Sequence, residues 1–198
     1  MDADRRLLMT RLAVLALAPT PALAADHPPT PSLTEGPFYP RTFPSDGDAD
    51  LTKVAGRAGR AQGTPLEMSG RLLDRTGRPL AGRRLEIWQC DATGLYHHVG
   101  EGEGDPDFQG WGATTTDADG RYAFRTIKPA PYPGRTPHIH FTVAENRRRV
   151  LTSQAFIEGV PGNERDFLYR QLGARATLVT MKLSGGSALA GTLDIVLG

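Results

Sequence analysis

Short stretches of alternating apolar and polar residues, separated by turn-forming residues, fill most of the chain after residue 65. In one stretch, two histidines alternate with Ile139, Phe141 and Val143, the period of two that places neighbouring side chains on opposite faces of a strand. The Asp-Ala-Asp-Gly sequence at 117–120 is typical of a tight hairpin turn. The pattern predicts strands at residues 66–74, 84–91, 111–116, 121–128, 137–145, 150–158, 176–183 and 189–197.

The stretch 163–172 has the features of a helix instead. Asn163 is a typical N-cap residue, and Phe167, Leu168 and Leu172 would share one apolar face. We expect this helix to cover one end of the strand structure.

The spacing of the strands indicates an all-β fold, an antiparallel β-sandwich with one short helix. A chain of 198 residues is long enough for one domain with a substantial core, which we place at residues 64–198. The 23 glycines and 16 prolines favour turns over long helices. Residues 26–63 lack clear periodicity and are predicted to form an extended N-terminal arm laid on the domain.

The first 25 residues have the pattern of a signal peptide. Arg5 and Arg6 precede a short apolar run at 12–18, and an Ala-x-Ala cleavage sequence follows at 22–24. The apolar run is too short to span a membrane. We therefore expect removal of residues 1–25 and export of the mature protein, periplasmic or secreted. The paired arginines also resemble a twin-arginine signal.

Charge and cysteine content narrow the possible partners. The net charge is +1 and no broad basic stripe is present, which argues against nucleic acid. The basic run Arg147 to Arg149 is interpreted as a solvated turn between strands. Cys90 is the only cysteine, so no internal disulfide can form, and burial as a small hydrophobic residue is expected. The sequence leaves open whether the chain forms a homo-oligomer.

Residues suited to metal chemistry fall into two groups. Tyr132, His138 and His140 lie within nine residues. On a strand the two histidines would share one face with their Cα atoms about 6.6 Å apart, close enough to reach a single metal ion. Tyr96 begins the second group, directly before the pair His97–His98.

The available ligands are thus imidazole and phenol, without a supporting cysteine cluster. Zinc usually takes cysteine or carboxylate alongside histidine, and ferrous oxygenases use two histidines and one carboxylate. A phenol becomes a ligand only where a strongly Lewis-acidic ion replaces its proton, and ferric iron suits phenolate oxygen. Two tyrosines and two histidines therefore indicate non-haem Fe(III) and a substrate that resembles a phenolate, such as a catechol.

Several segments also carry a family resemblance. They are TEGPFY at 34–39, LEIWQ and GLY within 85–96, FRTIKP at 124–129, and PYP and HIHF within 131–141. In this order, along residues 34–159, they resemble the intradiol ring-cleavage dioxygenases, especially the protocatechuate 3,4-dioxygenase branch. The chain is similar to a single-chain, exported member of that family.

The resemblance implies a role for each residue of the site. Tyr96 would be the retained equatorial phenolate and Tyr132 the axial one, displaced when a catechol binds. His138 and His140 would complete the iron shell. Arg135 would stabilise negative charge on the substrate.

Two further residues and the reaction follow from the same resemblance. Gln154 resembles the family's glutamine just outside the iron ligands, and Tyr39 is a candidate residue of the substrate pocket. The implied reaction consumes a catechol and O₂ and opens the ring between the two hydroxyl-bearing carbons to give a cis,cis-muconate. Tyr132 and His138 are only six positions apart, closer than in the protocatechuate enzymes, so a carboxylate on the substrate is not assumed.

Two other functions remain compatible with parts of the sequence. A transthyretin-like β-sandwich that binds a carbohydrate or a protein would fit the strand pattern and would need no metal. A zinc hydrolase would use the same histidines and would act without O₂. The presence of all four candidate iron ligands favours the dioxygenase.

Overall fold

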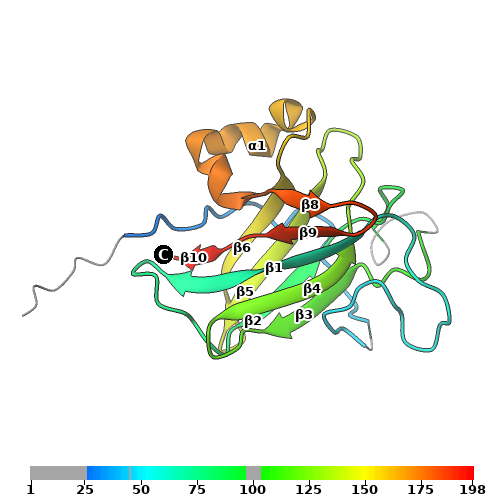
Figure 1. Ribbon diagram of the computed structural model, residues 1–198, viewed down its shortest axis with the longest axis horizontal. Helices are drawn as coiled ribbons and strands as arrows, with labels where there is room; N and C mark the ends of the chain where they lie inside the picture. Colours follow the sequence, from blue (N-terminus) through cyan, green and yellow to red (C-terminus); the bar gives the residue numbers. More distant parts are fainter. Residues whose placement is uncertain (1–25, 45, 97–103) are drawn as a thin grey trace, which may run out of the picture.

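Two β-sheets packed face to face form the domain (Figure 1), and the computed structural model describes residues 26–44, 46–96 and 104–198. One sheet has the strand order β3-β2-β5-β6-β7; the other has the order β10-β1-β9-β8, with β4 also paired to β1. The strands are β1 (Pro65–Asp74), β2 (Arg84–Trp88), β3 (Trp111–Thr115), β4 (Arg121–Ile127), β5 (His138–Glu145), β6 (Arg148–Ile157), β7 (Thr180–Met181), β8 (Leu183–Gly185), β9 (Leu189–Thr192) and β10 (Ile195–Leu197).

The core lies between the sheets and comes from alternate positions of the facing strands. Leu66 and Met68 of β1 and Phe124 of β4 belong to the same buried cluster as Ile87 of β2 and Phe141 of β5. Each of these side chains is at most 2% exposed, and burying one contributes about 1.5–3 kcal/mol. The alternation in the sequence therefore marks the core face of each strand, and on β5 it turns the histidines to the other face.

The arm that precedes β1 ties the two sheets together. Thr30 donates its backbone N–H to the carbonyl of Val196 at 3.0 Å and accepts the Val196 N–H through its hydroxyl at 2.9 Å. Three residues later, the N–H of Leu33 donates to the carbonyl of Thr152 on β6 at 3.0 Å. The arm therefore crosses from β10 to β6 and continues over the histidine-bearing face of β5.

The all-β sandwich predicted from the sequence is confirmed, but its sheets are mixed rather than purely antiparallel. Both β9 and β10 pair in parallel with β1, and β7 pairs in parallel with β6. The strand predicted at 189–197 is divided at Leu193, whose backbone approaches β1 so closely that a Cβ at Gly70 would lie 1.9 Å from the Leu193 carbonyl oxygen. Only glycine fits there.

The strand predicted at 176–183 is wrong in its first half. Residues up to 179 belong to a 3₁₀ helix, η2 (Gly173–Val179). Ala176 and Val179 are three residues apart, a spacing that brings them to one face of a 3₁₀ helix, and both belong to the same buried cluster as Phe156 of β6. The strand pattern continues only from residue 180.

The predicted helix at 163–172 is divided in two. A 3₁₀ turn, η1 (Asn163–Arg165), precedes α1 (Phe167–Leu172), and the N-cap of α1 is Asp166 rather than Asn163. Phe167 is 55% exposed, so its expected place on the apolar face is wrong. Leu168 and Leu172 do form the buried face, in the second cluster with Phe156. Among the described residues, no helix has the length and apolar character needed to cross a membrane.

Candidate metal and substrate site

His138 and His140 project from the face of β5 that lies beneath the arm. Each is 1% exposed, and their Nε2 atoms lie 3.2 Å apart. Two nitrogens bound to one ion at about 2.1 Å would lie roughly 3.0–3.4 Å apart. The spacing of the two imidazoles therefore suits ligands of a single metal.

Hydrogen bonding and burial leave the histidines in the form that a metal binds. Nδ1 of His138 lies 2.6 Å from the carbonyl oxygen of Thr136. Since a carbonyl can only accept, Nδ1 carries the proton and Nε2 presents its lone pair. Burial, with the nearby Arg135 cation, lowers the pKa of His138 to about 4 and that of His140 well below its usual value. Both imidazoles are neutral at pH 7.

Two phenols complete the cluster. The Tyr132 hydroxyl lies 3.3 Å from Nε2 of His138, and the rings of Tyr96 and Tyr132 lie 5.9 Å apart, edge to face. The Tyr96 hydroxyl is buried and has no hydrogen-bond partner among the described residues. An unpaired buried hydroxyl costs about 1–3 kcal/mol. Burial raises the pKa of both phenols, so a cation is needed to turn either into a phenolate.

Two turns place the tyrosines. Tyr132 to Arg135 form a β-turn in which the Arg135 N–H donates to the Tyr132 carbonyl at 2.9 Å. Proline at its second position and Gly134 at its third, with φ of 81°, are typical of a type II turn. Gly94, with φ of 90°, ends the turn before Tyr96, and a Cβ there would lie 3.5 Å from the Cβ of Tyr132. The two loops are therefore in contact, and this contact brings the Tyr96 and Tyr132 rings together.

Arg135 and Gln154 form a polar wall beside the cluster. Nη2 of Arg135 donates to Oε1 of Gln154 at 2.5 Å, and Nε donates to Oδ2 of Asp166 at 2.8 Å. Gln154 is fully buried opposite His140 on the neighbouring strand, and its amide donates to the carbonyl of Thr34 in the arm at 3.0 Å. The cation is therefore held next to Tyr132 and the histidines.

Three residues that the sequence did not assign to the site contact a candidate ligand or Arg135. Phe38 stacks on Tyr96 with centroids 4.3 Å apart and planes at 13°. Trp88 stacks on His140 at 4.9 Å and 12°. Asp166 anchors Arg135. Phe38 and Trp88 lie in two of the segments that carry the family resemblance, whereas no signal in the sequence distinguished Asp166 from a surface carboxylate.

Among the described residues, Tyr39, the candidate pocket residue, reaches the candidate ligands only indirectly, through Trp88, which stacks on His140. Its hydroxyl donates to Glu86 at 2.7 Å, its ring meets the edge of Trp88 at 4.9 Å, and the Arg149 guanidinium lies 4.0 Å from its centroid. Burial and the Glu86 carboxylate raise the pKa of Tyr39 to about 12. The adjacent Phe38, rather than Tyr39, touches the phenols.

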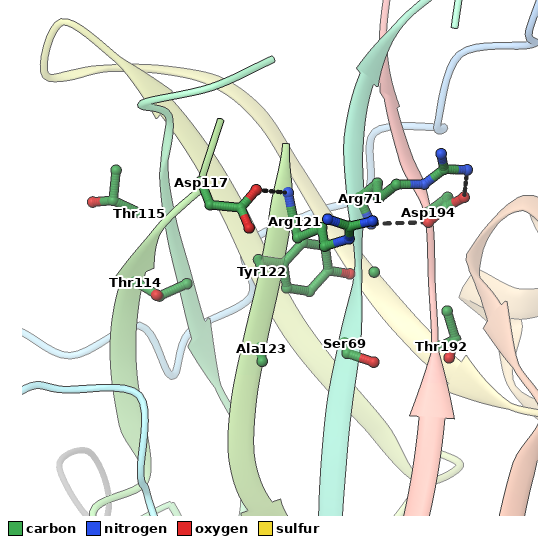
Figure 2. A pocket seen from close by; sticks show the side chains of 11 residues that line it. Ser69, Arg71, Thr114, Thr115, Asp117, Arg121, Tyr122, Ala123, Thr192 and Asp194 are labelled. Carbon is green, nitrogen blue, oxygen red and sulfur yellow. Dashed lines mark hydrogen bonds and ion pairs between the residues drawn. The ribbon is translucent and has the colours of Figure 1, made fainter. Parts of the chain in front are cut away.

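A cavity of about 650 Å³ opens beside the cluster and is lined by Tyr132, Arg135, Arg165 and Asp166 among others. A second cavity, of about 730 Å³, lies on the other sheet (Figure 2). In its wall, Arg71 and Asp194 form an ion pair at 3.1 Å. Its wall includes none of the four candidate ligands, whereas Tyr132 lines the first cavity, so the cavity beside Tyr132 is the candidate for substrate.

Comparison with known proteins identifies the family. The family model described as Dioxygenase matches residues 34–197. A protocatechuate 3,4-dioxygenase beta chain from Burkholderia cepacia is 36% identical in an alignment of 173 positions that covers 76% of this chain and 71% of the relative. The chain belongs to the intradiol ring-cleavage dioxygenases. The family resemblance and the enzyme class predicted from the sequence are thereby confirmed.

Other intradiol dioxygenases share part of their length with this chain. Catechol 1,2-dioxygenase 1 from Acinetobacter lwoffii is 33% identical in an alignment of 179 positions that covers 81% of this chain but only 56% of that enzyme. The dioxygenase domain of a dioxygenase carbohydrate-binding protein fusion from Streptomyces sp. SirexAA-E superposes with a TM-score of 0.70 at 35% identity, covering 86% of this chain and 98% of that domain. An intradiol ring-cleavage dioxygenase from Tetranychus urticae, at 21% identity and a TM-score of 0.72, covers 86% and 95% and shows the shared fold.

The intradiol family implies non-haem ferric iron, and the donor set of this chain fits it. Within residues 26–44, 46–96 and 104–198, no three His, Cys, Asp or Glu side chains form a cluster that could hold a metal, so the donors that converge there are two imidazoles and two phenols. The unpaired hydroxyl of Tyr96 is what a Lewis-acidic ion would satisfy. Neither zinc hydrolysis nor metal-free binding is favoured. His97 and His98 lie outside the described residues.

Proposed function

We propose that this intradiol dioxygenase uses Fe(III), held by Tyr96, Tyr132, His138 and His140, to open a catechol ring with O₂ between the two hydroxyl-bearing carbons. The observation that supports the iron site is that, among the described residues, Nε2 of His138 lies 3.3 Å from the Tyr132 hydroxyl and 3.2 Å from Nε2 of His140, beside the buried Tyr96 hydroxyl without a partner. The cis,cis-muconate product follows from cleavage at that bond.

The ferric ion, when bound, supplies the Lewis acidity that keeps phenol and catechol oxygens deprotonated at neutral pH. The two tyrosines would then differ in role. Tyr96 is packed under Phe38, whereas Tyr132 lines the cavity and is carried by a short turn. We infer that Tyr132 would be the phenolate that takes up a substrate proton when a catechol binds, while Tyr96 would stay in place.

Arg135 supplies the fixed positive charge of the site. Its side chain is 11% exposed, so its field acts in a medium poorer in water than the surface, where a charge has more effect. A catechol that gives one proton to Tyr132 and the other to solvent on binding brings negative charge to the cavity beside this guanidinium. Arg135 therefore stabilises the bound dianion and the charge that develops during ring opening.

The substrate class is a catechol that enters through the cavity beside Tyr132. That cavity, about 650 Å³, leaves room for ring substituents. Relatives carry the names protocatechuate, catechol and hydroxyquinol dioxygenase, and these three diols form the panel for a first assay.

The test measures metal content and O₂ uptake on that panel after ferric loading. We expect one iron per chain, a purple-red colour from phenolate-to-iron charge transfer, and ring-opened product formed with stoichiometric O₂. The colour and the activity should be lost in Tyr96→Phe and in His140→Ala. A protein that stays colourless and iron-free after loading would refute the proposal, and zinc-supported hydrolysis without O₂ would favour the hydrolase instead.

We further propose that the protein is exported after removal of residues 1–25, on the pattern of its N-terminal sequence alone. Edman sequencing of the protein recovered from the periplasm or medium should begin near Ala25. Recovery in the cytoplasm with Met1 retained would disprove export.

A further inference from the structure

The carboxylate of Asp166 joins helix α1 to the loop that leads into the histidine strand. Oδ1 accepts the N–H groups of Leu168 at 3.0 Å and Tyr169 at 3.2 Å, which is the N-cap of α1. Oδ2 accepts Nε of Arg135 at 2.8 Å and the N–H of Thr136 at 2.9 Å. The side chain is 0% exposed, so every one of these bonds replaces water.

Helix capping explains only half of these contacts. An N-cap needs one oxygen, and serine or asparagine provides it as well as aspartate does. The second oxygen of Asp166 faces away from the helix and receives two donors from the segment that carries Arg135. The second oxygen therefore adds a constraint on the direction of the Arg135 guanidinium.

The bonds of Arg135 define that direction. Nε is held by Asp166 and Nη2 by Gln154, which fixes the plane of the guanidinium from two sides. The other N–H groups of the guanidinium bind neither Asp166 nor Gln154. Arg135 lines the same cavity as Tyr132. Without Asp166, the Arg135 side chain could rotate about its stem and carry its charge away from the cavity.

We propose that Asp166 is a positioning residue, which holds the Arg135 guanidinium toward the place in the Tyr132 cavity where the catechol oxygens bind. The inference rests on the proposed function, because it concerns charge on the catechol. It adds a residue outside the candidate ligand set and makes the start of α1 part of the catalytic apparatus.

Asp166→Ser separates the two roles of the carboxylate. The serine hydroxyl can still cap α1, but it is too short to reach Arg135. We expect kcat on the preferred catechol to fall on the order of tenfold or more, with a smaller change in KM, because the misdirected charge matters most as negative charge develops. Leu172→Ala is the matched control: it removes a buried contact of α1 and lowers the melting temperature, but should leave kcat within about twofold of the wild type at an assay temperature where both are folded.

A second measurement does not depend on activity. In metal-free protein, urea unfolding of Asp166→Ser, of Arg135→Ala and of the double variant forms a cycle. We expect the double variant to lower the midpoint by clearly less than the sum of the two single changes, because both remove the same contact.

The outcomes are distinguishable. If the wild type is active and Asp166→Ser retains its kcat, if Leu172→Ala loses as much kcat as Asp166→Ser, or if the unfolding effects are additive, the positioning role is refuted while the dioxygenase function stands. If the iron-loaded wild type cleaves no catechol, the proposed function fails and this inference with it.

Discussion

His138 shows how much of the site is decided by the surroundings of a single side chain. An exposed histidine is partly protonated near neutral pH, but burial keeps this one neutral, and the Thr136 carbonyl directs its lone pair toward His140 and Tyr132. Tyr96 carries the opposite kind of constraint, since its hydroxyl is buried without a partner. In the metal-free protein, a candidate metal ligand therefore lowers the stability of the fold locally.

That cost can be measured in Tyr96→Phe. Because the substitution removes an unsatisfied buried hydroxyl, we expect the free energy of unfolding of the metal-free protein to rise by about 1 kcal/mol, while ferric iron binding is lost. Tyr122→Phe is the matched control, since the Tyr122 hydroxyl donates to the Leu193 carbonyl at 2.6 Å and its loss should cost about 1 kcal/mol. Equal destabilisation of both variants in urea unfolding would mean that Tyr96 has a partner in the metal-free state.

At the scale of elements, strand β5 carries the two histidines, and a turn and the first residues of a helix place the other functional groups beside them. Strand β5 presents both imidazoles on one face, as its period of two requires. The turn at Tyr132 and the short helix α1 bring a phenol and a fixed cation to that face. The sequence predicts Asn163 as the N-cap, whereas the structure has Asp166. Asparagine and aspartate are both good caps, so the sequence alone does not decide where the helix begins.

The turn can be tested with Gly134→Ala. At Gly134 φ is 81° and a Cβ would meet nothing within 4 Å, so the expected loss of about 1 kcal/mol in unfolding free energy is backbone strain alone. Because the turn carries both Tyr132 and Arg135, kcat should fall as well. Gly186→Ala, where a Cβ also meets nothing and φ lies outside the left-handed range, should stay within about 0.5 kcal/mol of the wild type. Similar effects of both substitutions would contradict the role of the turn.

The contribution of the α1 cap depends on pH. Burial raises the pKa of Asp166, but the bonds from Thr136, Arg135 and Tyr169 outweigh burial and hold it below its usual value. The stabilising contribution is therefore complete above the unfolded pKa, near 4, and is lost as pH falls through the folded pKa. In metal-free protein, the difference in unfolding free energy between wild type and Asp166→Ser should shrink from pH 7 to pH 3. A constant difference would contradict the lowered pKa.

At the scale of the whole molecule, the site is assembled from segments far apart in the sequence. The arm hydrogen-bonds to β6 and approaches His140 of β5, the loop after β2 carries Tyr96, and the N-cap of α1 binds Arg135. The arm in particular supplies Phe38 to the candidate ligands, and a Cβ at Gly36 would lie 3.5 Å from Cε1 of His140. The arm is thus a wall of the site rather than a linker.

Comparison of two arm phenylalanines tests this role. Phe38→Ala removes the stack on Tyr96 and should lower kcat/KM on the order of tenfold or more, because a shift of a ligand by about 1 Å is costly. Phe43 is in the same arm, is 50% exposed and contacts Tyr39 and Trp111, so Phe43→Ala should remain within about threefold. Equal losses in steady-state assays would show that the arm acts only as general packing.

The sequence alone determined the all-β character, the face on which the two histidines lie and the donor types offered to a metal, because strand period and ligand chemistry are local properties. Only the tertiary structure decided that β9 and β10 pair in parallel with β1, that residues 173–179 turn into a 3₁₀ helix, and that Phe38, Trp88 and Asp166 contact the ligands or Arg135. Those outcomes depend on contacts between residues distant in the chain, and a local pattern carries no information about which distant surfaces will meet.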